Sequence, residues 1–154
     1  MKYRYFFVLL LLLFSLFISC EDVADNSCSG VVCDAPMYAI GLDYMDAESG
    51  ESLIFGEDPP YSIDDLSAVS LETDREYFVT ADSSFTDKKI ALIYGSVSDV
   101  IKLTLGDLST DTLHINTLFR DVGCCGEIVL TDVQFNDKTV CTDCEAIPVV
   151  EILK

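Results

Sequence analysis

Seven cysteines carry most of the reactive chemistry in this sequence of 154 residues. Six of them lie downstream of Cys20 in three closely spaced pairs: Cys28 and Cys33, Cys124 and Cys125, and Cys141 and Cys144. Four thiolates can hold a zinc ion tetrahedrally, and a Cys-x-x-Cys pair such as Cys141-x2-Cys144 can carry out redox chemistry. Two oxidised cysteines can also join distant parts of the chain as a disulfide. The redox state of the cellular compartment decides between these chemistries, and the first residues of the chain indicate which compartment it is.

Cys20 belongs to a different pattern from the other cysteines. A short cationic start with Lys2 and Arg4 precedes an apolar run over residues 5–18, broken only by Ser15. This is the pattern of a cleaved signal peptide. At about 1.5 Å per helical residue, the run is shorter than the ~30 Å hydrocarbon core of a bilayer. A single membrane-spanning anchor is the alternative interpretation.

The segment Leu16-Phe17-Ile18-Ser19-Cys20 resembles a lipobox, the processing motif of bacterial lipoproteins. Phe17 stands where most lipoboxes have Leu, and the looser lipoboxes of Bacteroidota-type lipoproteins accept it. The resemblance implies that residues 1–19 are a signal peptide and that Cys20 carries diacylglycerol and acyl chains, which attach it stably to a membrane. The acidic residues after Cys20 also resemble a surface-export signal. We therefore expect an outer-membrane lipoprotein on the periplasmic or cell-surface face, with residues 20–33 as lipidated Cys and tether.

Export favours disulfides over the other two cysteine chemistries. A redox Cys-x-x-Cys pair needs a βαβ context and a helix that lowers the thiol pKa, and neither pattern surrounds Cys141. An even number of cysteines in an exported chain is typical of a disulfide framework. We predict that the six downstream cysteines are oxidised, although their spacing does not choose the pairing.

Charge and composition limit the partners. The formal charge of −18 includes Lys2 and Arg4, so removal of the signal leaves −20. Such a surface repels phosphate backbones, and we expect no nucleic-acid partner. We expect no cofactor beyond the acyl chains on Cys20, with calcium as a further candidate. The candidate calcium ligands are the acidic residues around the first turn: Asp43, Asp46, Glu48 and Glu51. Their spacing does not fit an EF-hand loop.

No residue pattern singles out a catalytic site. The sole histidine, His114, falls on the outward face of an alternating segment, and no Gly-x-Ser-x-Gly elbow occurs. Acidic residues are abundant, but their spacing marks no carboxylate pair for glycoside hydrolysis. Tyr38, Tyr44 and Tyr61 could stack on a sugar or pack on a partner protein, yet we expect at least two of them to fill the core.

Alternation of apolar and polar residues predicts strands along most of the mature chain. The predicted strands are 38–44, 53–55, 77–81, 90–94, 101–105, 113–119, 128–135 and 149–153. A short helix is predicted only over residues 62–70, where Ser62 and Asp65 form a capping pair. About 7–9 short strands indicate an all-β domain over residues 34–154, an antiparallel immunoglobulin-like β-sandwich after the cleaved signal helix.

The segment Asp46-Ala47-Glu48-Ser49-Gly50-Glu51-Ser52-Leu53 resembles the hairpin of carboxypeptidase-regulatory-like (transthyretin-like) sandwiches. It supports the fold class and implies no function. Taken together, the sequence favours a lipid-anchored, non-enzymatic binding or structural module of the cell envelope, with an unknown protein or glycan ligand. The alternatives are a small envelope hydrolase and a redox or metal-handling lipoprotein that uses the cysteines.

Overall fold

Strands occupy the regions where large apolar residues alternate with polar ones. The computed structural model describes residues 28, 30–84 and 88–154, and residues 33–154 form one compact unit. The strands are β1 (Tyr38–Met45), β2 (Leu66–Ser70), β3 (Val79–Asp82), β4 (Ile90–Gly95), β5 (Asp99–Leu105), β6 (Asp111–Val122), β7 (Cys125–Phe135), β8 (Lys138–Thr142) and β9 (Val149–Leu153). The 3-10 turn η2 (Ile63–Asp65) precedes β2. The predicted all-β class is therefore confirmed.

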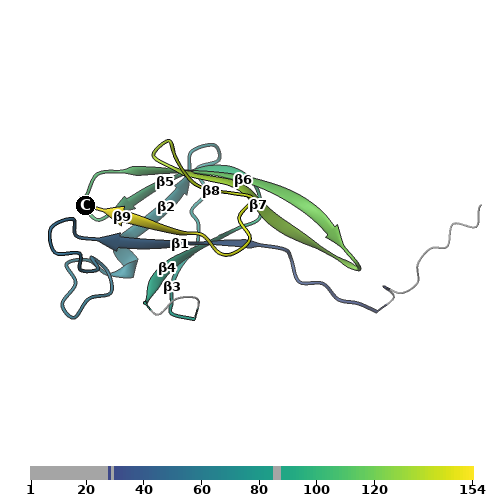
Figure 1. The fold of residues 1–154 in the computed structure, drawn as a ribbon, viewed down its shortest axis with the longest axis horizontal. Coiled ribbons are helices and arrows are strands. Elements are labelled where there is room, and N and C mark those ends of the chain that lie inside the picture. The colour runs from purple at the N-terminus through teal and green to yellow at the C-terminus, as the bar shows by residue number, and fades with distance from the viewer. Residues whose placement is uncertain (1–27, 29, 85–87) are drawn as a thin grey trace, which may run out of the picture. The chain divides into compact units, whose positions relative to one another are not determined.

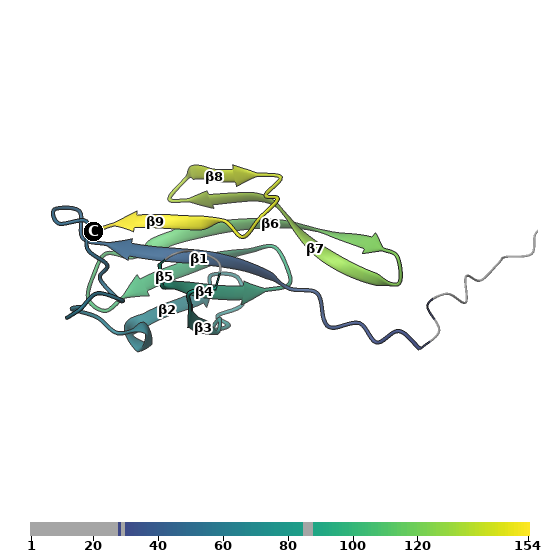
Figure 2. The ribbon, with the colours of Figure 1, turned by 60° about the horizontal axis from the view of Figure 1, so that its bottom comes forward.

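The strands form two sheets within this unit (Figures 1 and 2). One sheet has the order β3-β4-β1-β9, and the other has the order β2-β5-β6-β7-β8. The pairs are antiparallel except for β1 and β9, which run parallel. The strand β1 thus has β4 on one edge and β9 on the other, but β9 reaches only Gly41–Met45.

Both sheets contribute to one hydrophobic core. Leu42 of β1, Ile93 of β4 and Leu103 of β5 have no exposed surface. Burial of each such side chain contributes roughly 1.5–3 kcal/mol. Tyr38 and Tyr44 are buried in the same core, which confirms that at least two of the three tyrosines fill it.

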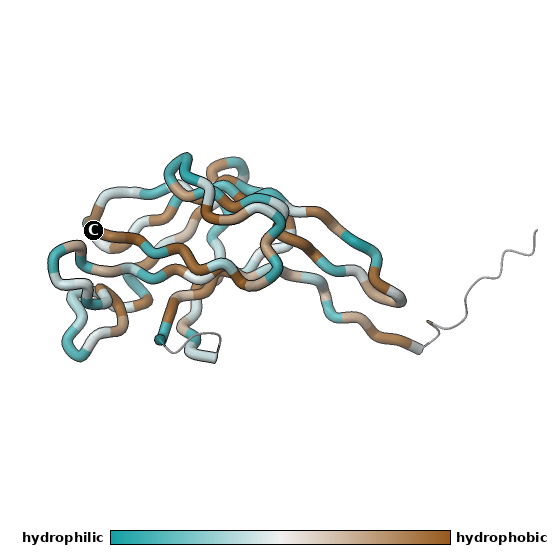
Figure 3. The backbone as a smooth tube through the Cα atoms, viewed as in Figure 1, coloured by the Kyte–Doolittle hydropathy of each residue, from teal (hydrophilic) through white to brown (hydrophobic). Residues whose placement is uncertain are grey.

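The hairpin of β6 and β7 extends beyond the other strands of its sheet (Figures 1 and 2). A bulge between Asn116 and Thr117 shifts its register, and beyond the bulge the residues of β6 are mostly exposed. Hydrophobic residues continue into this projecting part (Figure 3), where Leu118, Phe119 and Val122 are each at least half exposed. We call residues 117–130 the hairpin arm.

Two predicted elements are wrong. The segment predicted as a helix over residues 62–70 makes only the turn η2, whose start is capped by hydrogen bonds from the Ser62 amide and hydroxyl to Asp65 at 2.7 and 2.9 Å. Residues 66–70 then pair with β5, so tertiary pairing overrides the local helical pattern. Residues 53–55 form a turn in place of the predicted strand, since the Ser52 hydroxyl accepts hydrogen bonds from the Ile54 and Phe55 amides.

The remaining differences concern boundaries and one missed strand. The strand β8 was not predicted, and β3 begins at Val79 where the pattern predicted Tyr77. The predicted signal peptide and Cys20 lie outside the described residues. Within the described part of the chain, no helix combines the length and hydropathy needed to cross a membrane.

Candidate functional site

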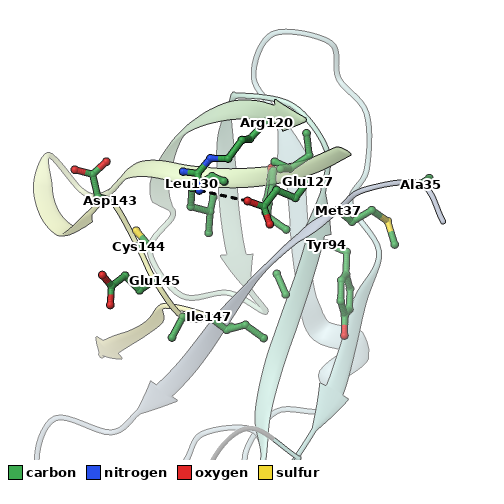
Figure 4. Close-up of a pocket in the computed structure, with 15 residues that line it drawn as sticks. Ala35, Met37, Tyr94, Arg120, Glu127, Leu130, Asp143, Cys144, Glu145 and Ile147 are labelled. Carbon is green, nitrogen blue, oxygen red and sulfur yellow. Dashed lines mark ion pairs between the residues drawn. The ribbon is translucent and has the colours of Figure 1, made fainter. Parts of the chain in front are cut away.

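A groove of about 870 Å³ opens between the N-terminal half of β1, the hairpin arm and the loop that joins β8 to β9. We call it the β1–β7 groove. Its volume falls within the range of roughly 300–1,000 Å³ that is typical of ligand pockets. Figure 4 shows Met37 and Tyr94 on one side, and Asp143 and Glu145 on the loop at the other side.

The groove exposes one edge of β1 because Pro148 ends the parallel pairing with β9. The Gly41 amide donates a hydrogen bond to the Pro148 carbonyl at 2.8 Å, and pairing continues from there to Met45. One step further back, the ladder would need an N–H at position 148 to meet the Ala39 carbonyl, and proline has none. Ala39 instead lines the groove.

The opposite wall is the hairpin arm. Strand β8 pairs with β7 only from Asp132 to Phe135, and the loop after β8 adds hydrogen bonds from the Asp143 and Cys144 amides to the Thr131 and Leu130 carbonyls. Further along the arm, Glu127, Ile128 and Val129 pair with β6 on one side and line the groove on the other.

Two disulfides border this end of the domain. Cys141 and Cys144 join across the start of the β8–β9 loop, which places Cys144 in the groove wall. Cys33 joins Cys125 near the tip of the arm and so fixes the segment that leads into β1. Cys28 and Cys124 are disulfide-bonded as well. The predicted oxidation of the six downstream cysteines is confirmed in the structure.

The polar lining is mostly acidic. Arg120 forms an ion pair with Glu127 at 3.4 Å, drawn as a dashed line in Figure 4. Both side chains are about half exposed, so the pair adds little to stability. Among the described residues, Asp143 and Glu145 form no ion pair with a cation. The groove therefore has three carboxylates and one guanidinium, of which the guanidinium is already paired.

Tyr38 closes the inner end of the groove. Its ring is buried over Gly95, where a Cβ atom would collide with the tyrosine hydroxyl, and this hydroxyl donates a hydrogen bond to the Val97 carbonyl at 3.2 Å. Burial raises the pKa of Tyr38 well above its ordinary value, and the neighbouring Tyr77 adds to the rise. Tyr38 is thus a neutral part of the floor at physiological pH, while Tyr94 lines the groove.

A second polar cluster lies in the core around Asp99. Its carboxylate accepts hydrogen bonds from the Ser70 hydroxyl at 2.9 Å, the Tyr77 hydroxyl at 2.5 Å and the Val100 amide at 2.7 Å. The Ser70 hydroxyl in turn accepts hydrogen bonds from the amides of Glu72 and Thr73. Burial, and then the hydrogen bond to Asp99, raise the pKa of Tyr77. These hydrogen bonds hold the turn after β2 against β5, so the role of the cluster is structural.

The four candidate calcium ligands lie on β1 and on the turn after it. Asp43 is 6% exposed and lies 3.9 Å from Lys88, and burial raises its pKa. Asp46 accepts hydrogen bonds from the Ser49 amide, the Ser49 hydroxyl and the Glu48 amide, which lower its pKa. Glu48 and Glu51 are exposed. The described residues contain no group of three or more ligating side chains, and calcium binding stays a prediction.

The other residues singled out from the sequence lie away from the groove. His114 is half-buried on β6, between the core residues Leu113 and Ile115, as its alternation predicts. The Tyr61 hydroxyl donates a hydrogen bond to Asp107 at 2.8 Å. Sequence reasoning missed Arg120, Glu127 and Glu145. Pro148 directly before an alternating segment was the one available signal, because proline limits where strand pairing starts.

No protein-family model, curated protein or solved structure matches this chain.

Proposed function

We propose that this chain is a lipid-anchored lipoprotein of the cell envelope whose domain, residues 34–154, is a non-enzymatic binding or structural module. The observation that carries the binding role is the β1–β7 groove, which combines an open strand edge with apolar and acidic side chains. The oxidised cysteines support an envelope location, because disulfides form and persist in oxidising compartments.

The anchor in this proposal is Cys20, with a diacylglycerol on its sulfur and the membrane as a partner through the lipid. It is supported by the apolar run that ends at Ser19-Cys20. The domain is an immunoglobulin-like β-sandwich in this proposal. Two sheets that share one core, together with the transthyretin-like pattern at residues 46–53, support that assignment.

Lipidation is tested with the variant Cys20→Ala in cells fed labelled palmitate. The unchanged chain should incorporate the label and migrate as a processed protein, whereas Cys20→Ala should stay an unlabelled precursor. The variant Cys28→Ala is a matched control, since it removes a cysteine downstream of the anchor, and it should keep the label. Label on Cys20→Ala would refute the anchor. Protease treatment of whole cells then separates the periplasmic from the cell-surface face of the outer membrane.

The non-enzymatic part is tested by screening the purified protein against glycosidase, esterase and peptidase substrates, with and without Ca²⁺ or Zn²⁺. We expect no turnover above that of the heat-unfolded protein. Turnover that a single substitution of an acidic residue or of His114 abolishes would overturn the binding-module proposal and favour the hydrolase.

A further inference from the structure

We propose that the β1–β7 groove binds an extended segment of a partner protein that carries alternating basic and apolar residues, and that the segment adds as a strand to the N-terminal half of β1. This inference rests on the proposed binding function and adds the chemical class of the ligand. The backbone, the side chains and the charge of the groove each support it.

The backbone argument concerns Ala39. Along a strand, the N–H and C=O of successive residues point to opposite edges. Because the Gly41 amide points to the β9 edge and bonds Pro148, the N–H and C=O of Ala39 point to the same edge. No backbone hydrogen bond joins Ala39 to the β8–β9 loop in the part of the chain that the structure describes. An added strand would satisfy both groups, which is how peptides add to open sheet edges.

The side-chain argument concerns the alternate residues of the added strand. One set would face the apolar part of the groove, which Met37, Tyr94, Ile128 and Ile147 line. The other set would face the loop that carries Asp143 and Glu145 (Figure 4). Since side chains alternate between the two faces of a strand, a repeat of one apolar and one polar residue fits both sides.

The charge argument fixes the sign of the polar residues. Arg120 is already paired with Glu127, so Asp143 and Glu145 leave the loop side of the groove negative. The whole chain has a charge of −18, which attracts cations over a longer distance. A segment with Lys or Arg at the polar positions is therefore favoured over a neutral or acidic one.

The same charges disfavour two other occupants. The stretch between Cys20 and Cys28 has acidic residues and no basic ones, so the chain's own tether is repelled from this groove. A second copy of the chain brings a further charge of −18. Each of these occupants would give a distinct result in the experiment below.

The experiment uses the full processed chain, purified in detergent from its native membrane. The probes are fluorescein-labelled peptides of four Lys-Val repeats, the same peptide with its central amides N-methylated, and four Glu-Val repeats. Binding is measured by fluorescence polarisation. N-methylation preserves the charge and removes the hydrogen-bond donors, so it separates strand addition from simple attraction of a cation to an acidic protein.

We expect the Lys-Val peptide to bind at least about tenfold more tightly than either other peptide. Glu145→Lys should weaken its binding by about tenfold, whereas Glu57→Lys, the same charge change at an exposed residue outside the groove, should weaken it less than about threefold. Ala39→Pro removes the N–H of residue 39 from the open edge and should weaken binding of the Lys-Val peptide by about tenfold. Since proline in a strand can impair folding, the peptide series on the unchanged protein is an independent readout.

Equal binding of the methylated and unmethylated peptides would overturn the proposal, and so would equal effects of Glu145→Lys and Glu57→Lys. A groove filled by a second copy would give a dimer that Glu145→Lys disrupts and no peptide binding. A groove filled by the tether would bind the peptide only after the tether is cleaved. Failure here with palmitate still on Cys20 would refute the ligand class and leave the anchor intact. Recovery of cleaved peptide would refute the non-enzymatic role instead.

Discussion

The two halves of β1 face the same core but differ at their edges. Residues 41–45 pair with β9 along one edge, and the Lys154 amide completes that ladder with a hydrogen bond to the Met45 carbonyl at 3.0 Å; Gly41 and Leu42 also pair with β4. Residues 38–40 have β4 on one edge and the β1–β7 groove on the other. Tyr38 and Ile40 are nonetheless as well buried as Leu42 and Tyr44. The side chains of a strand can thus be fully buried while one of its backbone edges has no neighbouring strand.

The two halves also differ in what holds their surroundings. Beside residues 41–45, Lys154 forms an ion pair with the buried Asp111 at 2.7 Å. Beside residues 38–40, the disulfides Cys33–Cys125 and Cys141–Cys144 border the groove. The two disulfides thus lie beside the part of β1 that β9 does not pair with. The open end can therefore keep an unpaired edge without fraying, which is what a binding site on a strand edge requires.

The largest expected effect comes from removing those covalent bonds. Cys33 and Cys125 are 92 residues apart, and closing a loop of that size stabilises a fold by roughly 4–5 kcal/mol in the chain-entropy account. Reduction of all the disulfides of the native protein should lower the free energy of unfolding by at least that amount, measured by urea titration. Hydrogen exchange at residues 38–40 should rise more than at residues 41–45.

The double variant Cys141→Ser/Cys144→Ser is the matched comparison, because its disulfide spans only 3 residues. The same account gives it a loss of roughly 2 kcal/mol or less. If this variant lost as much stability as the fully reduced protein, the long-range disulfide would not be what holds the open end.

Much of the sheet structure could be predicted from the sequence, whereas the groove as an assembly of residues could not. The strands around residues 38–44, 90–94 and 149–153 were predicted well because period-2 alternation is a local signal. The oxidation of the cysteines followed from their even number. The pairing of the cysteines depends on which turns the fold brings together. The disulfide between Cys33 and Cys125 therefore has no local sequence signature.

The groove depends on where pairing stops, and pairing is not a local property. Arg120 and Glu127 are cross-strand partners only because β6 and β7 form a bulged hairpin, and Glu145 lines the same groove because the chain turns at Cys141–Cys144. The predicted helix over residues 62–70 failed for the same reason, since β5 provides the partner edge that residues 66–70 join. In each case the sequence does not reveal which segment of the chain lies beside the residues in the folded protein.

The second largest effect compares burial within β1 with burial at Met37, directly before the strand. Leu42 has no exposed surface, so Leu42→Ala should destabilise the protein by about 2–5 kcal/mol through lost burial and the cavity that remains. Met37, at the mouth of the groove, is 61% exposed, and Met37→Ala should change stability by less than about 0.5 kcal/mol. Thermal or urea unfolding measures both. A loss above about 2 kcal/mol for Met37→Ala would mean that the mouth of the groove is part of the core.

The third effect concerns the ion pair between Lys154 and Asp111, beside residues 41–45, which we call the closed end of β1. Lys154→Met keeps the aliphatic stem and removes the ammonium group from Asp111, which is 4% exposed. Among the described residues, Asp111 would then keep the side-chain hydrogen bond from the Asn136 amide group. A buried carboxylate left without its cation should cost about 1–3 kcal/mol. Lys102→Met, at an exposed position on β5, is the control and should be near neutral. Equal stabilities of the two variants would show that the pair does not hold the closed end.

The smallest effect on stability gives the sharpest test of the comparison between the two halves. Pro148→Ala supplies the N–H that the parallel ladder lacks, so the Ala39 carbonyl gains a donor and the pairing of β9 should extend by one step. A new hydrogen bond adds about 0.5–1.5 kcal/mol, and the loss of proline costs about 0.4–1 kcal/mol through the unfolded chain, so the net change should be near zero.

The structural change should still be visible, because the new amide at position 148 should be protected from hydrogen exchange. Binding of the Lys-Val peptide should fall severalfold, since the peptide would then compete with β9 for Ala39. Pro60→Ala, an exposed proline outside the groove, should leave the peptide affinity unchanged. If the amide at position 148 exchanges freely and the peptide still binds as before, Pro148 is not what keeps this edge of β1 open.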